Sequence, residues 1–400
     1  MRRQTASIIL VLVIGAVARC SPPAPHTPSV SSLALLQALA DSGKDLPRPL
    51  LPAGADTNSA STYYRFGTRI AVEADTAEMA LYWAAKLDPS WAEPLYARFF
   101  NALDALRHDA SLTYMRTHSS RAAGNVTLTP RQIRVVDSLQ EIAWQRNPFL
   151  FSNREFQGLA PGRLGEPVHD GWLAFASSRF AAAESLFGVE LRKHPEAVAI
   201  RIYRARALFY LGRYDGAVTE LAAARDTVRR STEARLSPML PSIEMFDFAI
   251  GIARVQQDDF PAARAAFERA LTENLAFYWA HTRLAGSALA LHDTATALAE
   301  LDMAIQLEGR DPVLRLYRAV VLQNAGRLTE ADLDLRKAIE LDPYYAAPYY
   351  FLAVNSQTGG DTSSAIVRFR QYLARAARDD FYRAYAVRAL TAFGAVRDSS

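Results

Sequence analysis

Cysteine is almost absent from this chain of 400 residues, and lysine is rare. Cys20 is the single cysteine, which excludes an intrachain disulfide. Arginine carries nearly all of the positive charge, because lysine occurs only at Lys44, Lys86, Lys193 and Lys337. The 45 basic and 42 acidic residues are interleaved along the chain. This arrangement indicates a solvated surface and argues against a basic stripe for nucleic acid.

The residue patterns of common catalytic and metal sites are also missing. The seven histidines form no HExxH or other spaced set of ligands. There is no glycine-rich phosphate loop and no GxSxG motif. His169 and Asp170 are adjacent, and adjacent residues on a helix point apart, so they do not suit a catalytic pair. The sequence therefore predicts a protein without catalytic residues, cofactor or metal.

A short apolar run lies at the N-terminus. Arg2 and Arg3 precede it, and the run covers residues 8–18. It is too short for a membrane-spanning helix, which needs about 20 residues. A basic start followed by a short apolar run is typical of a signal peptide. We therefore predict a signal peptide over residues 1–19 and a location outside the cytoplasm.

Cys20 follows this run within the sequence VARC, and SPPAPHTP comes after it. This order resembles a bacterial lipoprotein, although Arg19 stands where a small residue is usual. The resemblance implies a lipid anchor on Cys20 and a place in the cell envelope facing the periplasm. In lipoproteins of this kind an aspartate after the cysteine often retains the protein in the inner membrane, so by resemblance Ser21 favours the outer membrane. Two other interpretations remain open: cleavage after Ala18, which would release a periplasmic or secreted protein, and an uncleaved anchor with an unmodified thiol.

Residues 20–55 are rich in proline. Proline lacks the amide N–H and fixes φ, so it favours an extended chain over a packed element. We expect this stretch to be a poorly packed tether, with a short helix over 32–40.

Small and large apolar residues recur at an interval of 34 residues. One row is formed by Ala263, Ala297, Ala331 and Ala365. Four positions further on, a row of large residues is formed by Phe267, Leu301, Leu335 and Phe369. Twelve positions before the alanines, a row of small residues is formed by Gly251, Ala285, Ala319 and Ala353. Small residues that flank a large one on a helix face allow a neighbouring helix to approach closely.

Each interval divides into two helices and a turn. A turn such as NAGR at 324–327 contains a glycine, which can adopt positive φ and end a helix. Pro343 stops the second helix and suits the first turn of the next one. The pattern resembles the tetratricopeptide repeat, down to AIELDP at 338–343. The resemblance implies an all-α, right-handed α-solenoid of helix–turn–helix repeats, in which neighbouring hairpins cover one another.

The repeat register divides the chain into segments. The prediction is a first repeat over 56–91, degenerate helical repeats over 92–163, two repeats over 164–231, an insertion over 232–243, four repeats over 244–379, and a capping helix with a tail over 380–400.

In tetratricopeptide arrays the first helix of each hairpin lines a concave groove. Carried over to this sequence, the groove positions are Tyr203, Arg206, Phe209, Tyr210, Phe248, Ile252, Thr282, Arg283, Leu316, Tyr317, Val320, Asn324, Tyr350, Phe351, Val354 and Gln357. Aromatic and arginine side chains of this kind are enriched in protein-binding hot spots. Many of these rings could instead be buried between helices. The lysine that clamps a peptide carboxylate in some family members is absent, since its position holds Ile202, Phe248, Leu316 and Tyr350.

The sequence thus predicts a non-enzymatic envelope scaffold that binds a segment of another envelope protein in its groove, with no nucleic-acid partner. The alternative is a lipoprotein that binds a glycan or another small envelope ligand. Aromatic side chains such as Trp144 or Trp172 would supply a sugar-binding platform in that case.

Overall fold

The computed structural model describes residues 44–69, 72–102, 139, 142–150, 167–231 and 241–395. Within these ranges all regular secondary structure is α-helical. The expected signal peptide, Cys20, the expected helix over 32–40 and most of the expected insertion over 232–243 lie outside them. Among the helices of these ranges, none is both long enough and apolar enough to span a bilayer.

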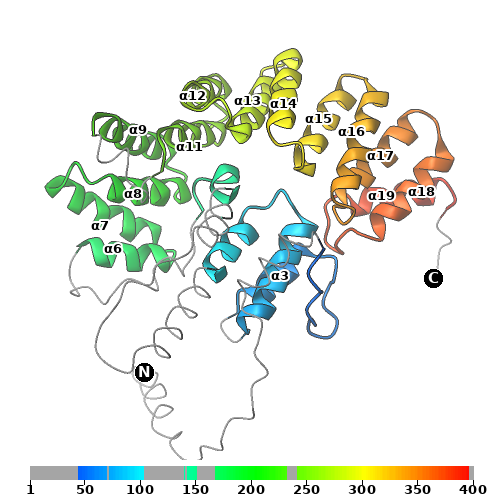
Figure 1. Ribbon diagram of the computed structural model, residues 1–400, viewed down its shortest axis with the longest axis horizontal. Helices are drawn as coiled ribbons and strands as arrows, with labels where there is room; N and C mark the ends of the chain where they lie inside the picture. The colour runs from blue at the N-terminus through cyan, green and yellow to red at the C-terminus, as the bar shows by residue number, and fades with distance from the viewer. Residues whose placement is uncertain are drawn as a thin grey trace, which may run out of the picture.

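The helices follow one another as pairs along the chain (Figure 1). The pairs are α2 (Ala60–Gly67) with α3 (Ala74–Leu87), α6 (Pro167–Ala176) with α7 (Phe180–Lys193), α8 (Val198–Tyr210) with α9 (Tyr214–Arg230), α11 (Ile243–Val255) with α12 (Phe260–Glu273), α13 (Tyr278–Ala290) with α14 (Thr294–Leu307), α15 (Pro312–Asn324) with α16 (Leu328–Leu341), and α17 (Ala347–Thr358) with α18 (Thr362–Leu373). A single helix, α19 (Arg383–Ala392), follows the last pair. The expected fold class, an all-α solenoid of helix–turn–helix pairs, is confirmed.

The turn inside each pair from α6 to α18 contains one residue with positive φ. These residues are Ser178, Gly212, Asp258, His292, Gly326 and Gly360. Glycine adopts this conformation without steric cost, whereas other residues rarely do. The same backbone turn is therefore kept where the sequence has no glycine, because the packing of the two helices requires it.

Small residues on the first helices allow phenylalanines of the second helices to pack against the backbone. A Cβ on Gly251 would lie 2.3 Å from Cε1 of Phe267, and a Cβ on Gly171 would lie 2.7 Å from Cε1 of Phe187. Both phenylalanines are fully buried. Alanine stands at the same position in four other pairs, opposite leucine in three of them, Ala205 with Leu221, Ala285 with Leu301 and Ala319 with Leu335, and opposite phenylalanine in one, Ala353 with Phe369.

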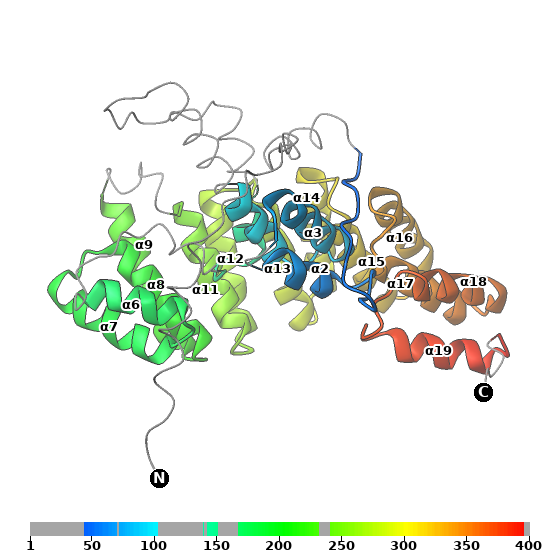
Figure 2. The same ribbon diagram turned by 90° about the horizontal axis from the view of Figure 1, so that it is seen from below.

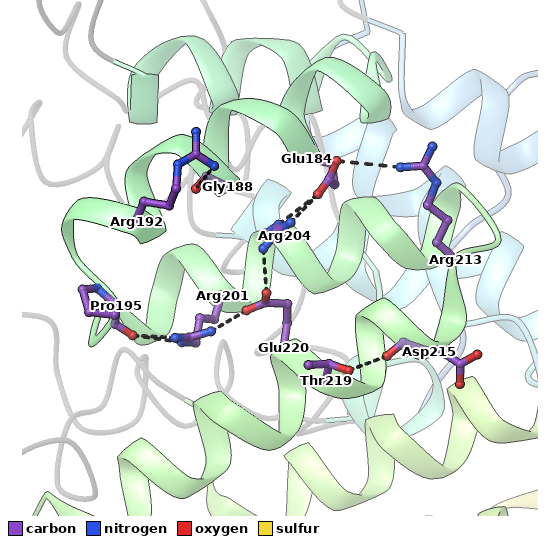
Figure 3. Close-up of polar contacts among 10 residues, drawn as sticks. All are labelled: Glu184, Gly188, Arg192, Pro195, Arg201, Arg204, Arg213, Asp215, Thr219 and Glu220. Atoms are coloured by element: carbon purple, nitrogen blue, oxygen red, sulfur yellow. Dashed lines mark hydrogen bonds and ion pairs between the residues drawn. The ribbon is translucent and has the colours of Figure 1, made fainter.

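Ion pairs join the two helices of several hairpins. In α8, Arg201 pairs with Glu220 of α9 at 2.7 Å, and Arg204 pairs with Glu220 at 2.8 Å and with Glu184 of α7 at 2.6 Å (Figure 3). Arg204 thereby links three successive helices. Equivalent pairs occur further along the array, Arg315 with Asp334 at 3.1 Å and His281 with Glu300 at 2.6 Å.

The pairs from α6 to α18 form an arch, and the first hairpin, α2 and α3, lies inside it (Figure 1). Seen from below, α2 and α3 lie in front of the middle of the arch, between its two ends (Figure 2). The first hairpin therefore does not extend the stack at the end marked by α6. It lies against the concave side instead.

Leu46, Arg48 and Leu51 contact the first hairpin, although a poorly packed tether was expected up to residue 55. Leu46 is buried, and its carbonyl accepts a hydrogen bond of 2.9 Å from the indole N–H of Trp83. The guanidinium of Arg48 lies 4.2 Å from the centre of a Trp83 ring. For these residues the expectation was wrong, because proline content says nothing about an aromatic surface supplied by another helix.

Candidate functional site

A short segment of the N-terminal part, residues 142–150, lies against the first helices of the array. We call it the inner segment. The ring of Phe149 stacks on Phe209 of α8 with 3.7 Å between ring centres. The carbonyl of Phe149 accepts a hydrogen bond of 2.8 Å from the hydroxyl of Tyr210. Phe149 is only 1% exposed. The inner segment thus covers two of the predicted groove residues on α8.

Arg146 fastens the same segment to α13 and α15. Its guanidinium pairs with Asp311 at 3.0 Å and lies 5.5 Å from the centre of a Trp279 ring. Its backbone carbonyl accepts a hydrogen bond of 3.2 Å from Nη2 of Arg283. Asp311 also caps α15, because its carboxylate accepts a hydrogen bond of 3.0 Å from the amide of Val313. The ion pair of Arg146 is therefore made with the residue that caps the N-terminus of α15.

The first hairpin contacts the array near the start of α17. The rings of Trp83 and Tyr344 meet edge to face with 4.9 Å between their centres. Lys86 lies 3.8 Å from the carboxylate of Asp342. Burial raises the pKa of Asp342 to about 6, and the positive charge of Lys86 opposes that rise.

Residues before α2 reach the far end of the array, just after α18. The side-chain amide of Asn58 donates a hydrogen bond of 3.0 Å to the carbonyl of Ala374. The carboxylate of Asp56 accepts one of 2.7 Å from the backbone amide of Arg378. Described residues that precede α6 therefore contact the array at α8, at α13 and α15, before α17 and after α18.

Beside the inner segment, the array contains an apolar hollow between α11 and α17, with a volume of about 550 Å³. Apolar side chains dominate its walls, among them Val255, Leu289, Leu316, Val320, Val321 and Phe351. Two hydroxyls in the wall already have partners. Thr282 donates to the carbonyl of Tyr278 at 2.9 Å, and Ser287 donates to that of Arg283 at 3.2 Å. The walls consequently offer few free polar groups.

Arg283 is the charged side chain in the wall of the hollow. Its Nε atom is buried and has no hydrogen-bond partner, and no carboxylate of the described ranges pairs with it. Burial lowers the pKa of Arg283, and the nearby Tyr317 opposes this. By contrast, Arg315 and Arg318 on the next first helix both pair with Asp334, at 3.1 Å and 2.7 Å.

Six of the predicted groove residues come together in the hollow. They are Thr282, Arg283, Leu316, Tyr317, Val320 and Phe351. On α8, Tyr203 packs beside Trp172 and Phe175, and Arg206 is buried with its guanidinium 5.4 Å from the Tyr203 ring centre. These two contribute to packing within the N-terminal end of the array.

The remaining predicted residues lie outside the hollow, and two of them are buried. Phe248 is fully buried against Phe267 and Phe277, while Ile252 packs against the same cluster. Tyr350 is buried beneath the residues around α19 and stacks on Tyr382 with 4.3 Å between ring centres. Assigning Phe248 and Tyr350 to an open groove was wrong, because neighbouring helices cover their rings.

Three positions remain near the end of the array. Val354 is half-buried in the cluster of α17, α18 and α19, and Asn324 is exposed at the end of α15. The side-chain oxygen of Gln357 accepts a hydrogen bond of 3.2 Å from the hydroxyl of Tyr385.

The two tryptophans considered for a sugar platform lie in different clusters. Trp144 packs with Tyr96 and Phe99, and Trp172 packs with residues of α6 and α7. Both are half-buried, so the structure does not bring them together on one surface.

The inner segment itself was missed by sequence reasoning. The signal was Pro148 followed by Phe149 and Leu150, an apolar pair directly after a helix stop, in a stretch expected to be degenerate repeats.

No family model and no curated protein matches the chain. Among solved structures it is similar to YrrB, described as a TPR protein with an unusual peptide-binding site, at 19% identity and a TM-score of 0.39 over 51% of this chain and 97% of that one. It is similar to MamA at 18% identity and a TM-score of 0.37, over 43% of this chain and 94% of that one. It is also similar to TTC0263, a thermophilic TPR protein of Thermus thermophilus, at 18% identity and a TM-score of 0.37, over 49% of this chain and 100% of that one.

Proposed function

We propose that the protein is a non-enzymatic scaffold of the tetratricopeptide type that binds a segment of a partner protein on its concave face. One observation carries the proposal: the concave face already holds a polypeptide segment of its own chain. Phe209, Tyr210 and Arg283 make these contacts with the inner segment. Aromatic and arginine side chains are the residues that dominate the energy of protein interfaces.

We further propose that the partner segment is helical and places apolar side chains in the hollow. An extended segment would bury amide groups against walls that have few free hydrogen-bonding groups, which costs free energy. A helix satisfies its own backbone hydrogen bonds, and it can present apolar side chains to a groove.

Site-specific photo-crosslinking tests this function in cells. A photo-reactive amino acid at Val320 or Phe351 would lie in the wall of the hollow, whereas one at Met303 or Arg336 would lie on a second helix. Groove positions are expected to capture the same partner protein, and second-helix positions are expected to miss it. Equal capture from both sets, or none from the groove positions, would contradict the proposal.

An envelope location with a lipid anchor on Cys20 is part of the proposal. Its support is the order of basic residues, apolar run, cysteine and proline-rich stretch at the N-terminus. Labelling with radioactive palmitate, followed by fractionation, tests it when wild type is compared with Cys20→Ala. An unlabelled, soluble wild-type protein would instead indicate cleavage after Ala18.

The hollow favours a small apolar ligand as a second candidate function. Its volume of about 550 Å³ lies within the range of about 300–1,000 Å³ that is typical of small-molecule sites. A glycan suits it poorly, because sugar hydroxyls need hydrogen-bond partners that these walls do not supply.

A further inference from the structure

The first step concerns the charge in the hollow. An arginine side chain stays protonated in proteins, so Arg283 brings a full positive charge into an apolar wall. A buried charge without a counter-charge costs free energy, and proteins usually pair such a group. Among the residues that the structure describes, the guanidinium donates to a neutral carbonyl, that of Arg146, at 3.2 Å. Arg283 therefore lacks an anionic partner in the described part of the chain.

The second step concerns the acidic groups on this side of the array. Asp311 and Asp88 both act electrostatically on Tyr317, which lines the hollow beside Arg283. Asp311 is engaged by Arg146 at 3.0 Å. Asp88 accepts hydrogen bonds from the amide and hydroxyl of Ser90, at 3.1 Å and 2.6 Å. Neither carboxylate neutralises Arg283.

The third step concerns Tyr317. Burial raises the pKa of its hydroxyl, although the charges of Arg283 and Arg146 oppose this. The hydroxyl therefore stays protonated at neutral pH. A neutral hydroxyl beside a guanidinium can donate to an anion that the guanidinium attracts.

We propose that the hollow binds an amphipathic monocarboxylate with an unbranched apolar chain, such as a medium- or long-chain fatty acid. The carboxylate would pair with Arg283 and accept a hydrogen bond from Tyr317. The chain would lie against Leu316, Val320 and Phe351. An alkyl chain needs no polar partners along its length, which suits walls in which apolar side chains dominate. This inference rests on the second candidate function, a small apolar ligand in the hollow, and it names the chemical class of that ligand.

Direct binding to the purified full chain tests the inference. The probes are dodecanoate and 1-dodecanol, measured by displacement of a fluorescent fatty acid at concentrations below micelle formation. We expect saturable binding of dodecanoate at least tenfold tighter than that of the alcohol. Equal affinity for the two probes, or no saturable binding of dodecanoate, would overturn the proposal.

Variants of Arg283 separate the contribution of the ion pair from nonspecific binding to apolar surface. Arg283→Gln is expected to lower the affinity for dodecanoate at least tenfold and to leave the affinity for dodecanol unchanged. Arg283→Lys is expected to keep most of the preference for dodecanoate over dodecanol. Arg336→Gln removes the same charge from an exposed position on α16 and is expected to change nothing. If Arg283→Gln is folded and binds dodecanoate like wild type, the assignment is wrong.

Thermal unfolding monitors the one structural risk, since Arg283 also holds the carbonyl of Arg146. If Arg283→Gln were unstable, Val320→Trp would replace it as the test, because a larger side chain fills the hollow without changing its charge. It is expected to weaken both probes. This assay and the crosslinking experiment above can fail independently, because they use different ligands.

Discussion

Nδ1 of His281 lies 2.6 Å from a carboxylate oxygen of Glu300, at the positions where two other hairpins pair arginine with an acid. Nε2 of the same ring lies 2.9 Å from the carbonyl oxygen of Leu275. The carbonyl oxygen accepts, and so does the carboxylate form of Glu300, so the doubly protonated ring is the form that donates to both. While its ring is protonated, His281 therefore supplies the positive charge that arginine supplies in the other two hairpins.

The first prediction concerns the pH dependence of stability. Burial lowers the pKa of His281, but the hydrogen bonds to Glu300 and Leu275 outweigh it, and the net pKa is raised. Because the pKa of His281 is higher in the folded state than in the unfolded state, protonation stabilises the folded protein. This stabilisation is complete at pH values below the unfolded-state pKa of about 6.5, and it is lost as the pH rises through the folded-state pKa. His281→Gln should remove that loss in chemical unfolding curves measured from pH 5.5 to 8.5. An unchanged slope in the variant would refute the assignment of the charge.

The second prediction concerns the close packing of Gly251 and Phe267. Gly251→Ala places a methyl group within 2.3 Å of the Phe267 ring, so it should destabilise the protein by about 1–3 kcal/mol. The double variant with Phe267→Leu restores the alanine–leucine combination of Ala285 with Leu301, and it should recover part of the loss. Additive losses in the double variant, measured by denaturant unfolding, would show that the clash is not the cause.

The third prediction concerns the left-handed turn residues. His292 has φ of 61° at the position where another hairpin has Gly326. His292→Gly should stabilise the protein by about 0.5–1 kcal/mol, since glycine relieves the strain of positive φ more than it adds unfolded-state entropy. Gly326→Ala should destabilise the protein, because alanine is strained at positive φ. Melting temperatures that move in the same direction for both variants would contradict this account.

The fourth prediction concerns the inner segment. Phe149→Ala removes a buried ring that stacks on Phe209, and such losses cost about 3–5 kcal/mol in well-packed cores. Hydrogen exchange in α8 should accelerate. Phe381→Ala serves as the matched control, because that ring is 88% exposed and should change stability by less than about 0.5 kcal/mol. Similar effects of the two variants would mean that the inner segment contributes little.

The fifth prediction concerns Asp342, where the first hairpin meets the array. Its pKa of about 6 lies above the ordinary value of 3.8, so the charged form is unfavourable in the folded state. Stability from this group therefore rises as pH falls through 6 toward 4. Asp342→Asn should be more stable than wild type at pH 8, by at most roughly 3 kcal/mol, and the difference should vanish near pH 4. A constant difference at all pH values would exclude burial of the charge as its origin.

Much of the array could be predicted from the sequence because its determinants are local. Ala331, Leu335 and Ala338 lie on one face of α16, and that face is buried as the pattern indicates. The concave side could not be predicted, because its contacts join distant residues such as Arg146 and Asp311. Nor could the pattern tell whether a ring at a groove position is open, as at Phe351, or covered, as at Tyr350.

The contacts of Asp56 and Asn58 with residues after α18 have a consequence for folding during synthesis. These partners are separated by 322 and 316 residues, so the first hairpin leaves the ribosome long before its docking surface exists. Solenoids usually fold by adding one repeat to the next, which needs only neighbouring contacts. Here the nascent N-terminal hairpin must wait with its apolar surface uncovered, and such exposed surface is prone to aggregate. Docking of the first hairpin therefore has to follow the folding of the last hairpin, and contacts between residues so distant in sequence form slowly.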